Sequence, residues 1–85
     1  MAITAAVYRS GILMGSGTAT AGSVTISSFT VRNDGLGGDA DHTIHGGRNV
    51  QVMCTGGVSS NGVFNTRVVT DGGTSLTLAD ACPYT

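Results

Sequence analysis

The sequence predicts an all-β domain, and three features of its composition carry this prediction. Glycine fills fourteen of the 85 positions, about twice its usual share of roughly 7%. Lysine and glutamate, two good helix formers, are absent. Threonine and valine favour strands, and glycine and asparagine favour the turns between them. We therefore expect residues 1–85 to form one domain, a small antiparallel β-barrel or β-sandwich of five to six short strands with long glycine-rich loops.

The first segment of the chain has two alternative structures. Residues 2–11 alternate loosely between apolar and polar and read as a first strand or as an extended arm. Ile12, Leu13 and Met14 follow as a consecutive apolar run. Because three adjacent side chains cannot all face one side of a strand, this run is either buried on both faces or meets a partner. It therefore completes the core of the domain, or residues 1–15 form an N-terminal arm that contacts a neighbour.

The next stretch, "GTATAGSVTISSFTV" at residues 17–31, predicts a β-hairpin. Residues 21–23, Ala-Gly-Ser, supply the turn. In the second strand the pair Ser27-Ser28 interrupts the alternation of apolar and polar side chains. This change of phase predicts a β-bulge.

Three more strands follow a long loop at residues 33–48. Alternation is regular at residues 49–55, 63–70 and 75–80, and the glycine-rich stretches between these segments predict turns. The side chains that we expect to face the core are Val50, Val52, Cys54, Leu76 and Leu78. At residues 63–70, alternation places Phe64, Thr66 and Val68 on one face and the other side chains on the opposite face.

The long loop contains "DGLGGDADHTIHGG", which holds both histidines of the chain. Its carboxylates and imidazoles suit zinc or another divalent cation, with Asp39, Asp41, His42 and His45 as the candidate ligands. Their spacing matches no metal motif, however, and the chain has no glutamate to close a calcium loop of the EF-hand kind. Aspartate, histidine and glycine are also ordinary loop residues. We therefore predict no bound metal and no cofactor.

No catalytic motif is present in the sequence. None of the serines lies in a G-x-S-x-G context, and neither "GLGG" nor "GSG" is followed by the lysine that a phosphate-binding loop needs. A domain of this size also has little wall area for a deep pocket. We therefore expect a protein that is not an enzyme and has no catalytic residue. A metal-dependent enzyme built on the histidine-containing loop is an alternative of another class.

The charge of the chain excludes two classes of partner. The formal net charge is -1, and the four cations are scattered arginines. Nucleic acid and anionic membranes both require a basic patch, so we expect neither as a partner. No basic region precedes the apolar residues at the start of the sequence, and Arg9 divides them. We therefore expect neither a secretion signal nor a membrane span.

Cys54 and Cys82 have two alternative states. The first lies on the predicted inward face of a strand, and the second follows the last strand. They can pair as a disulfide, which would add about 3 to 4 kcal/mol to stability by the chain-entropy estimate. They can also remain free thiols that pack like small apolar side chains. Without a secretion signal we favour the free thiols.

Two segments resemble small structural proteins of tailed bacteriophages. One is "GTATAGSVTISSFTV", and the other is "NVQVMCTGGVSSNGVFNTRVVTDGGTSLTLADACPY". The second is similar in rhythm to the small β-barrel domains of head decoration (cement) proteins. This resemblance implies a homo-oligomer, with a trimer favoured, that is made in the host cytoplasm and binds the major capsid protein on the surface of the virion. The apolar residues that would make the contacts are Ile12, Leu13, Met14, Leu36 and Ile44.

Two other functions remain open. Within the same structural class, the chain could be a tail or fibre accessory protein. In a different class, it could be a small ligand- or carbohydrate-binding module with residues 34–47 as the rim of its site. Sugar sites usually present exposed aromatic rings, and this chain has two tyrosines and two phenylalanines.

Overall fold

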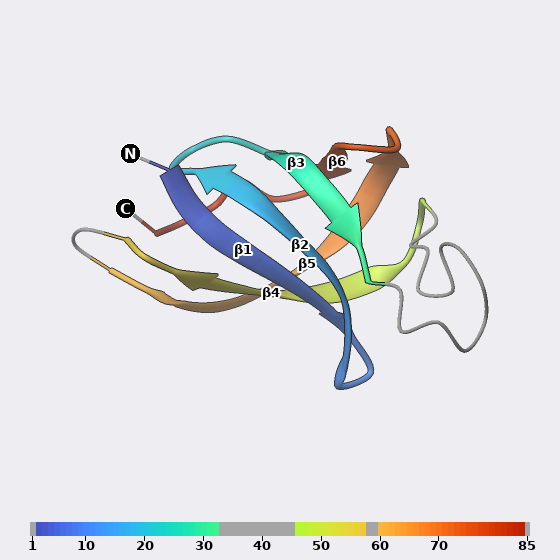
Figure 1. The fold of residues 1–85 in the computed structure, drawn as a ribbon, viewed down its shortest axis with the longest axis horizontal. Coiled ribbons are helices and arrows are strands. Elements are labelled where there is room, and N and C mark those ends of the chain that lie inside the picture. Colours follow the sequence, from blue (N-terminus) through green and yellow to red (C-terminus); the bar gives the residue numbers. More distant parts are fainter. Residues whose placement is uncertain (1, 33–45, 58–59, 85) are drawn as a thin grey trace.

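The computed structural model describes residues 2–32, 46–57 and 60–84, which form a closed barrel of antiparallel strands (Figure 1). The all-β prediction is confirmed, and of its two architectures the structure has the barrel. The strands are β1 (Ala2–Arg9), β2 (Ile12–Thr20), β3 (Thr25–Val31), β4 (Asn49–Thr55), β5 (Gly62–Asp71) and β6 (Leu76–Leu78).

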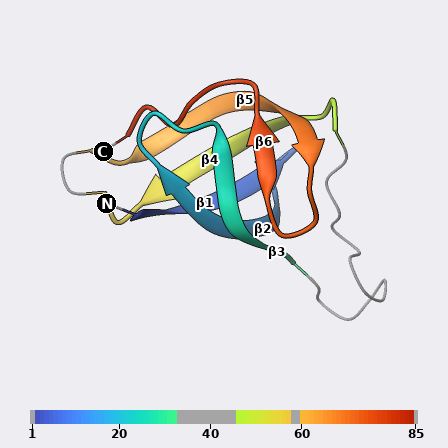
Figure 2. The same ribbon diagram turned by 90° about the horizontal axis from the view of Figure 1, so that it is seen from above.

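The barrel consists of two three-stranded units that meet along two seams. β1, β2 and β3 are neighbours in chain order, as are β4, β5 and β6, and the order around the barrel is β1-β2-β3-β6-β5-β4. One seam pairs β1 with β4, where Val7 lies opposite Val52. The other pairs β3 with β6, where Ile26 lies opposite Leu76. Figure 2 shows the short strand β6 between β3 and β5.

The N-terminal segment belongs to the barrel wall. β1 is paired with β2 on one side and with β4 on the other. A tight turn at Ser10 and Gly11 joins β1 to β2, and both residues have positive φ, 52° and 79°. Positive φ at both central residues gives a hairpin turn the twist that its strands require. Residues 2–9 are therefore a strand and not an arm.

The hairpin predicted at residues 17–31 is confirmed, with its turn and its bulge. At the turn, the Ser23 amide donates a hydrogen bond to the Thr20 carbonyl at 2.9 Å. Further along β3, Ser28 has a φ of 52°, and the register with β2 shifts there. The extra residue in β3 explains the change of phase that the two adjacent serines predicted.

A single apolar core fills the barrel. The side chains predicted to face inward are all buried. On β5 the face with Phe64, Thr66 and Val68 is the inward one; Phe64 is partly buried and packs against the core. Strands β1 and β2 add Ile3, Ala5, Val7, Met14 and Ala19, and β3 adds Ile26 and Phe29. Alternation along each strand therefore leaves one set of side chains inside and directs the other to the outer surface.

Candidate functional site

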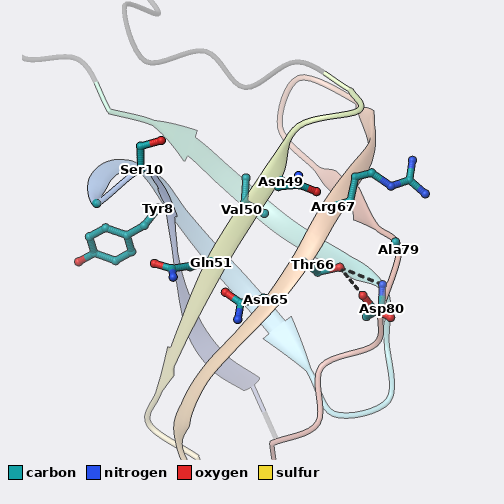
Figure 3. A pocket seen from close by; sticks show the side chains of 11 residues that line it. Tyr8, Ser10, Asn49, Val50, Gln51, Asn65, Thr66, Arg67, Ala79 and Asp80 are labelled. Carbon is teal, nitrogen blue, oxygen red and sulfur yellow. Dashed lines mark hydrogen bonds between the residues drawn. The ribbon is translucent and has the colours of Figure 1, made fainter.

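A polar cleft crosses the outer surface of the barrel, with a volume of about 610 Å³. Its walls come from the end of β1, the turn after it, the start of β4, the middle of β5 and the segment that follows β6 (Figure 3). The lining residues are Tyr8, Ser10, Gly11, Asn49, Val50, Gln51, Asn65, Thr66, Arg67, Ala79 and Asp80.

The register of three strands places the polar side chains of the cleft in two rows. Tyr8 of β1 lies opposite Gln51 of β4, which lies opposite Asn65 of β5. In the next row Asn49 lies opposite Arg67. These residues alternate with core residues on each strand, so their side chains face outward. Figure 3 shows the tyrosine ring at one end of the cleft and Asp80 at the other, with the amides between them.

One buried hydroxyl anchors the far end of the cleft. Thr66 is 7% exposed, and among the described residues it is the one polar side chain that is buried. Its hydroxyl donates a hydrogen bond to Oδ2 of Asp80 at 2.9 Å and accepts one from the Asp80 amide at 3.1 Å. The Ala79 amide adds a bond to the Arg67 carbonyl at 2.8 Å. These bonds fix the segment after β6 against β5 and hold the Asp80 carboxylate at the rim.

The chemistry of the cleft suits a neutral polar ligand. Side-chain amides and hydroxyls both donate and accept hydrogen bonds, and one arginine and one aspartate balance in charge. The described lining includes no histidine or cysteine, and its carboxylate is already bonded to Thr66. The hydroxyl bonded to this carboxylate, that of Thr66, is buried.

An uncharged strip of side chains lies beside the cleft on the same outer surface. Ala6 of β1 lies opposite Met53 of β4, which lies opposite Val63 of β5. Leu13 of β2 lies opposite Tyr8 in the neighbouring row. Ala6, Met53, Leu13 and Tyr8 are half-buried, and Val63 is 52% exposed. We call these five residues the outer strip.

The apolar run after the first turn is divided between the surface and the core. Ile12 is 50% exposed and Leu13 is half-buried, whereas Met14 is buried in the core. Of these three predicted contact residues, only the first two reach the surface. The other predicted contact residues, Leu36 and Ile44, lie outside the described residues.

The candidate metal ligands also lie outside the described residues; they are Asp39, Asp41, His42 and His45. Within the described ranges, no group of three or more histidine, cysteine, aspartate or glutamate side chains is placed to hold a metal ion. No helix in the described part of the chain is long and apolar enough to cross a membrane.

The two cysteines are free thiols in the structure and share one part of the core. Cys54 is 1% exposed and Cys82 is 4% exposed. Burial raises the pKa of the Cys54 thiol to about 12, with further contributions from the charge of Cys82 and a side-chain hydrogen bond with it. At neutral pH the Cys54 side chain is therefore a protonated thiol.

The sequence patterns predicted that Gln51 faces outward and that Asn65 and Arg67 share a face, but they did not predict the cleft. Its walls depend on β1 lying beside β4, and alternation alone does not reveal the neighbours of a strand. The pairing of Thr66 with Asp80 was missed for the same reason. Comparison with known proteins found no match among family models, curated proteins or solved structures.

Proposed function

We propose that this chain is a structural protein that acts through protein–protein contacts, as a decoration protein on the capsid of a tailed bacteriophage. The outer strip is the observation that supports this proposal. It spans four strands, and neither of its two rows contains a charged residue. Depletion of charge and the presence of methionine and tyrosine are typical of the buried centre of protein interfaces.

The closed barrel determines how a partner would bind. Its strand order gives each described strand a neighbour on both sides, which leaves little edge to which a partner could add a strand. Contact would then be made mainly through outward side chains. The partner that we propose is the major capsid protein of the same virion, and a tail or fibre position is the alternative location.

Self-association fits the size of the domain. A domain of 85 residues buries a smaller fraction of its surface on folding than a larger domain does, so association with further copies would add stability. We propose a homotrimer, which is the state implied by the resemblance to decoration proteins. Such a protein would have no catalytic residue and no cofactor.

The polar cleft favours a second candidate function, the binding of a neutral, hydroxyl-rich ligand such as a carbohydrate. The ring of Tyr8 provides a flat apolar surface at one end, and Asn49, Gln51 and Asn65 provide amides along the floor. Sugars are commonly held by such a combination of ring and amide groups. The cleft and the outer strip share Tyr8, so one experiment can compare the two functions.

The test replaces one apolar residue of the strip with a charge. Val63→Asp places a carboxylate in the outer strip, and Val69→Asp is the matched control. Val69 is on the same strand, is 47% exposed, and lies about 20 Å away at about 3.3 Å per residue. Native mass spectrometry measures the oligomer, and co-sedimentation measures binding to capsids assembled from the major capsid protein of the same genome.

We expect the wild type and Val69→Asp to form the same oligomer and to sediment with capsids. Val63→Asp should bind capsids at least tenfold more weakly, because an unpaired carboxylate buried in the interface is costly. Equal binding by both variants would overturn the assignment of the strip. A wild-type protein that is monomeric and does not sediment with capsids would overturn the proposal itself. Chemical-shift changes confined to Tyr8 and Gln51 on addition of neutral oligosaccharides would then support the second candidate.

A further inference from the structure

Two thiols that are far apart in the sequence meet inside the barrel. Cys54 lies in β4, where it is paired with Ala5 on one side and Gly62 on the other. Cys82 lies in the C-terminal segment, residues 79–84, and belongs to the same core cluster. The Cys82 thiol donates a hydrogen bond to the Tyr84 carbonyl at 3.6 Å, and the Tyr84 ring lies against Gly62, the β5 partner of Cys54. The fold therefore places both thiols in the same part of the core, where each affects the other's environment.

Beyond Asp80, which is bonded to Thr66, a few hydrogen bonds attach the rest of the C-terminal segment to the barrel. The Cys82 amide donates to the Ser23 carbonyl at 3.0 Å, and its own carbonyl accepts from the Gly22 amide at 2.9 Å. At the end of the segment, the Tyr84 hydroxyl donates to the Val63 carbonyl at 2.8 Å. The segment is not a strand, so it can separate locally while β4 remains paired on both sides.

We propose that Cys54 and Cys82 form a dithiol site that low-molecular-weight disulfides oxidise to an internal disulfide, which fastens the C-terminal segment to β4. The proposal does not depend on the function proposed above. Local opening would expose Cys82, which makes Cys82 the attacking thiol and Cys54 the resolving thiol.

The exchange proceeds in two balanced steps. The Cys82 thiol loses its proton to solvent, and the thiolate attacks one sulfur of the small disulfide, which releases the first small thiolate and leaves a mixed disulfide. Cys54 then loses its proton and attacks the Cys82 sulfur, which releases the second small thiolate. The two cysteines are oxidised by two electrons in total, and the small disulfide is reduced to two thiols.

The environment of Cys54 makes the second step sensitive to pH. Its partners on the neighbouring strands, Ala5 and Gly62, carry no charge. The titratable groups packed with it in the described core are Cys82 and Tyr84. Because burial raises the pKa of the Cys54 thiol to about 12, its thiolate fraction increases with pH across the range from neutral to mildly alkaline. The second step should therefore accelerate about tenfold per pH unit in that range.

The test treats the reduced protein with oxidised glutathione at several pH values, stops the reaction with acid and alkylates the remaining thiols. Intact mass spectrometry then distinguishes the products. We expect each wild-type chain to lose two hydrogens, without glutathione and without a disulfide to another chain. A reductant should return it to the dithiol. Cys54→Ser should stop at one glutathione adduct, because the resolving thiol is missing. Cys82→Ser should remain reduced.

The wild-type result decides the proposal even where a variant folds poorly. A final state with two glutathione adducts, a disulfide-linked dimer or an unreacted dithiol would overturn it. Oxidation should also raise the urea midpoint of the wild type, since the disulfide restricts the unfolded chain. A urea midpoint that does not rise when the internal disulfide forms would show that the disulfide does not fasten the C-terminal segment to β4. That result would overturn this part of the proposal.

Discussion

At the scale of single residues, the hydroxyl of Thr66 is a polar group buried in the described core, so it needs hydrogen-bond partners there. It lies among apolar side chains of β5, and both of its bonds go to Asp80. A buried polar group is tolerated when it is paired, and it destabilises the fold when its partner is removed. Thr66 therefore links the wall of the barrel to the segment that follows β6.

We predict that Thr66→Val destabilises the protein by about 1 to 3 kcal/mol, although the two side chains have nearly the same shape. The substitution leaves the Asp80 amide without its acceptor and removes one hydrogen bond from the carboxylate. Urea unfolding followed by circular dichroism measures the loss. Thr66→Ser keeps the hydroxyl and is the control, with a smaller loss due to the missing methyl group. Equal losses in the two variants would contradict a role for the hydrogen bonds.

The sequence was informative about direction at this scale and uninformative about partners. Alternation predicted that Thr66 shares a face with Phe64 and Val68, because side chains on a strand alternate between two faces, and the structure places that face toward the core. Nothing in the pattern indicated Asp80, which lies beyond a turn and a further strand. The two cysteines illustrate the same limit. The burial of Cys54 could be predicted, but its proximity to Cys82 depends on the position of the C-terminal segment.

At the scale of elements, the "GSG" stretch in β2 allows β3 to approach closely. A Cβ atom added at Gly17 would lie 2.7 Å from Cγ2 of Ile26 and 2.7 Å from the Ser27 carbonyl oxygen. Real side chains essentially never show such short distances. The crowding arises at the bulge, where the register between β2 and β3 shifts and Ser28 has a positive φ. Glycine in β2 and paired serines in β3 are therefore two parts of one local structure.

We predict that Gly17→Ala destabilises the barrel by about 1 to 3 kcal/mol, because the added methyl group must displace backbone and a buried isoleucine. Ser16→Ala is the control, since Ser16 is exposed on the same strand. Thermal unfolding of both variants gives the comparison. A Gly17→Ala variant as stable as the control would mean that β3 shifts freely, and the close packing at the bulge would not be a constraint.

The existence of the strands could be predicted better than their arrangement. Residues 49–55 and 63–70 alternate strictly, and both form strands with the expected faces. Residues 2–9 alternate only loosely, so strand and arm could not be distinguished. The structure resolves this because β4, far along the chain, pairs with β1. That pairing is also what forms the polar cleft and the outer strip.

At the scale of the whole molecule, the two seams differ in strength. The β1–β4 seam is continuous from Thr4 to Tyr8. The β3–β6 seam contains only Thr25 and Ile26 on the side of β3. Two single hydrogen bonds extend it: the Leu78 amide donates to Val24 at 2.7 Å, and the Phe29 amide donates to Thr74 at 2.7 Å.

We predict that the barrel opens first along the β3–β6 seam. Local opening requires the least free energy where the fewest contacts are broken. In native-state hydrogen exchange, the amides of Leu78 and Phe29 should therefore exchange at a lower free energy than the most protected amides of β4, which is paired on both sides. Low concentrations of urea should reduce the difference between the two sets until they merge, because global opening exposes more surface than opening of the seam. If both sets exchange at the same free energy and with the same urea dependence, the barrel opens as one unit and the two seams are equivalent.

The disulfide proposed between β4 and the C-terminal segment gives a second readout, because it joins the chain on both sides of β5. Oxidation should slow exchange at Leu78, four residues before Cys82, more than it slows exchange at Phe29.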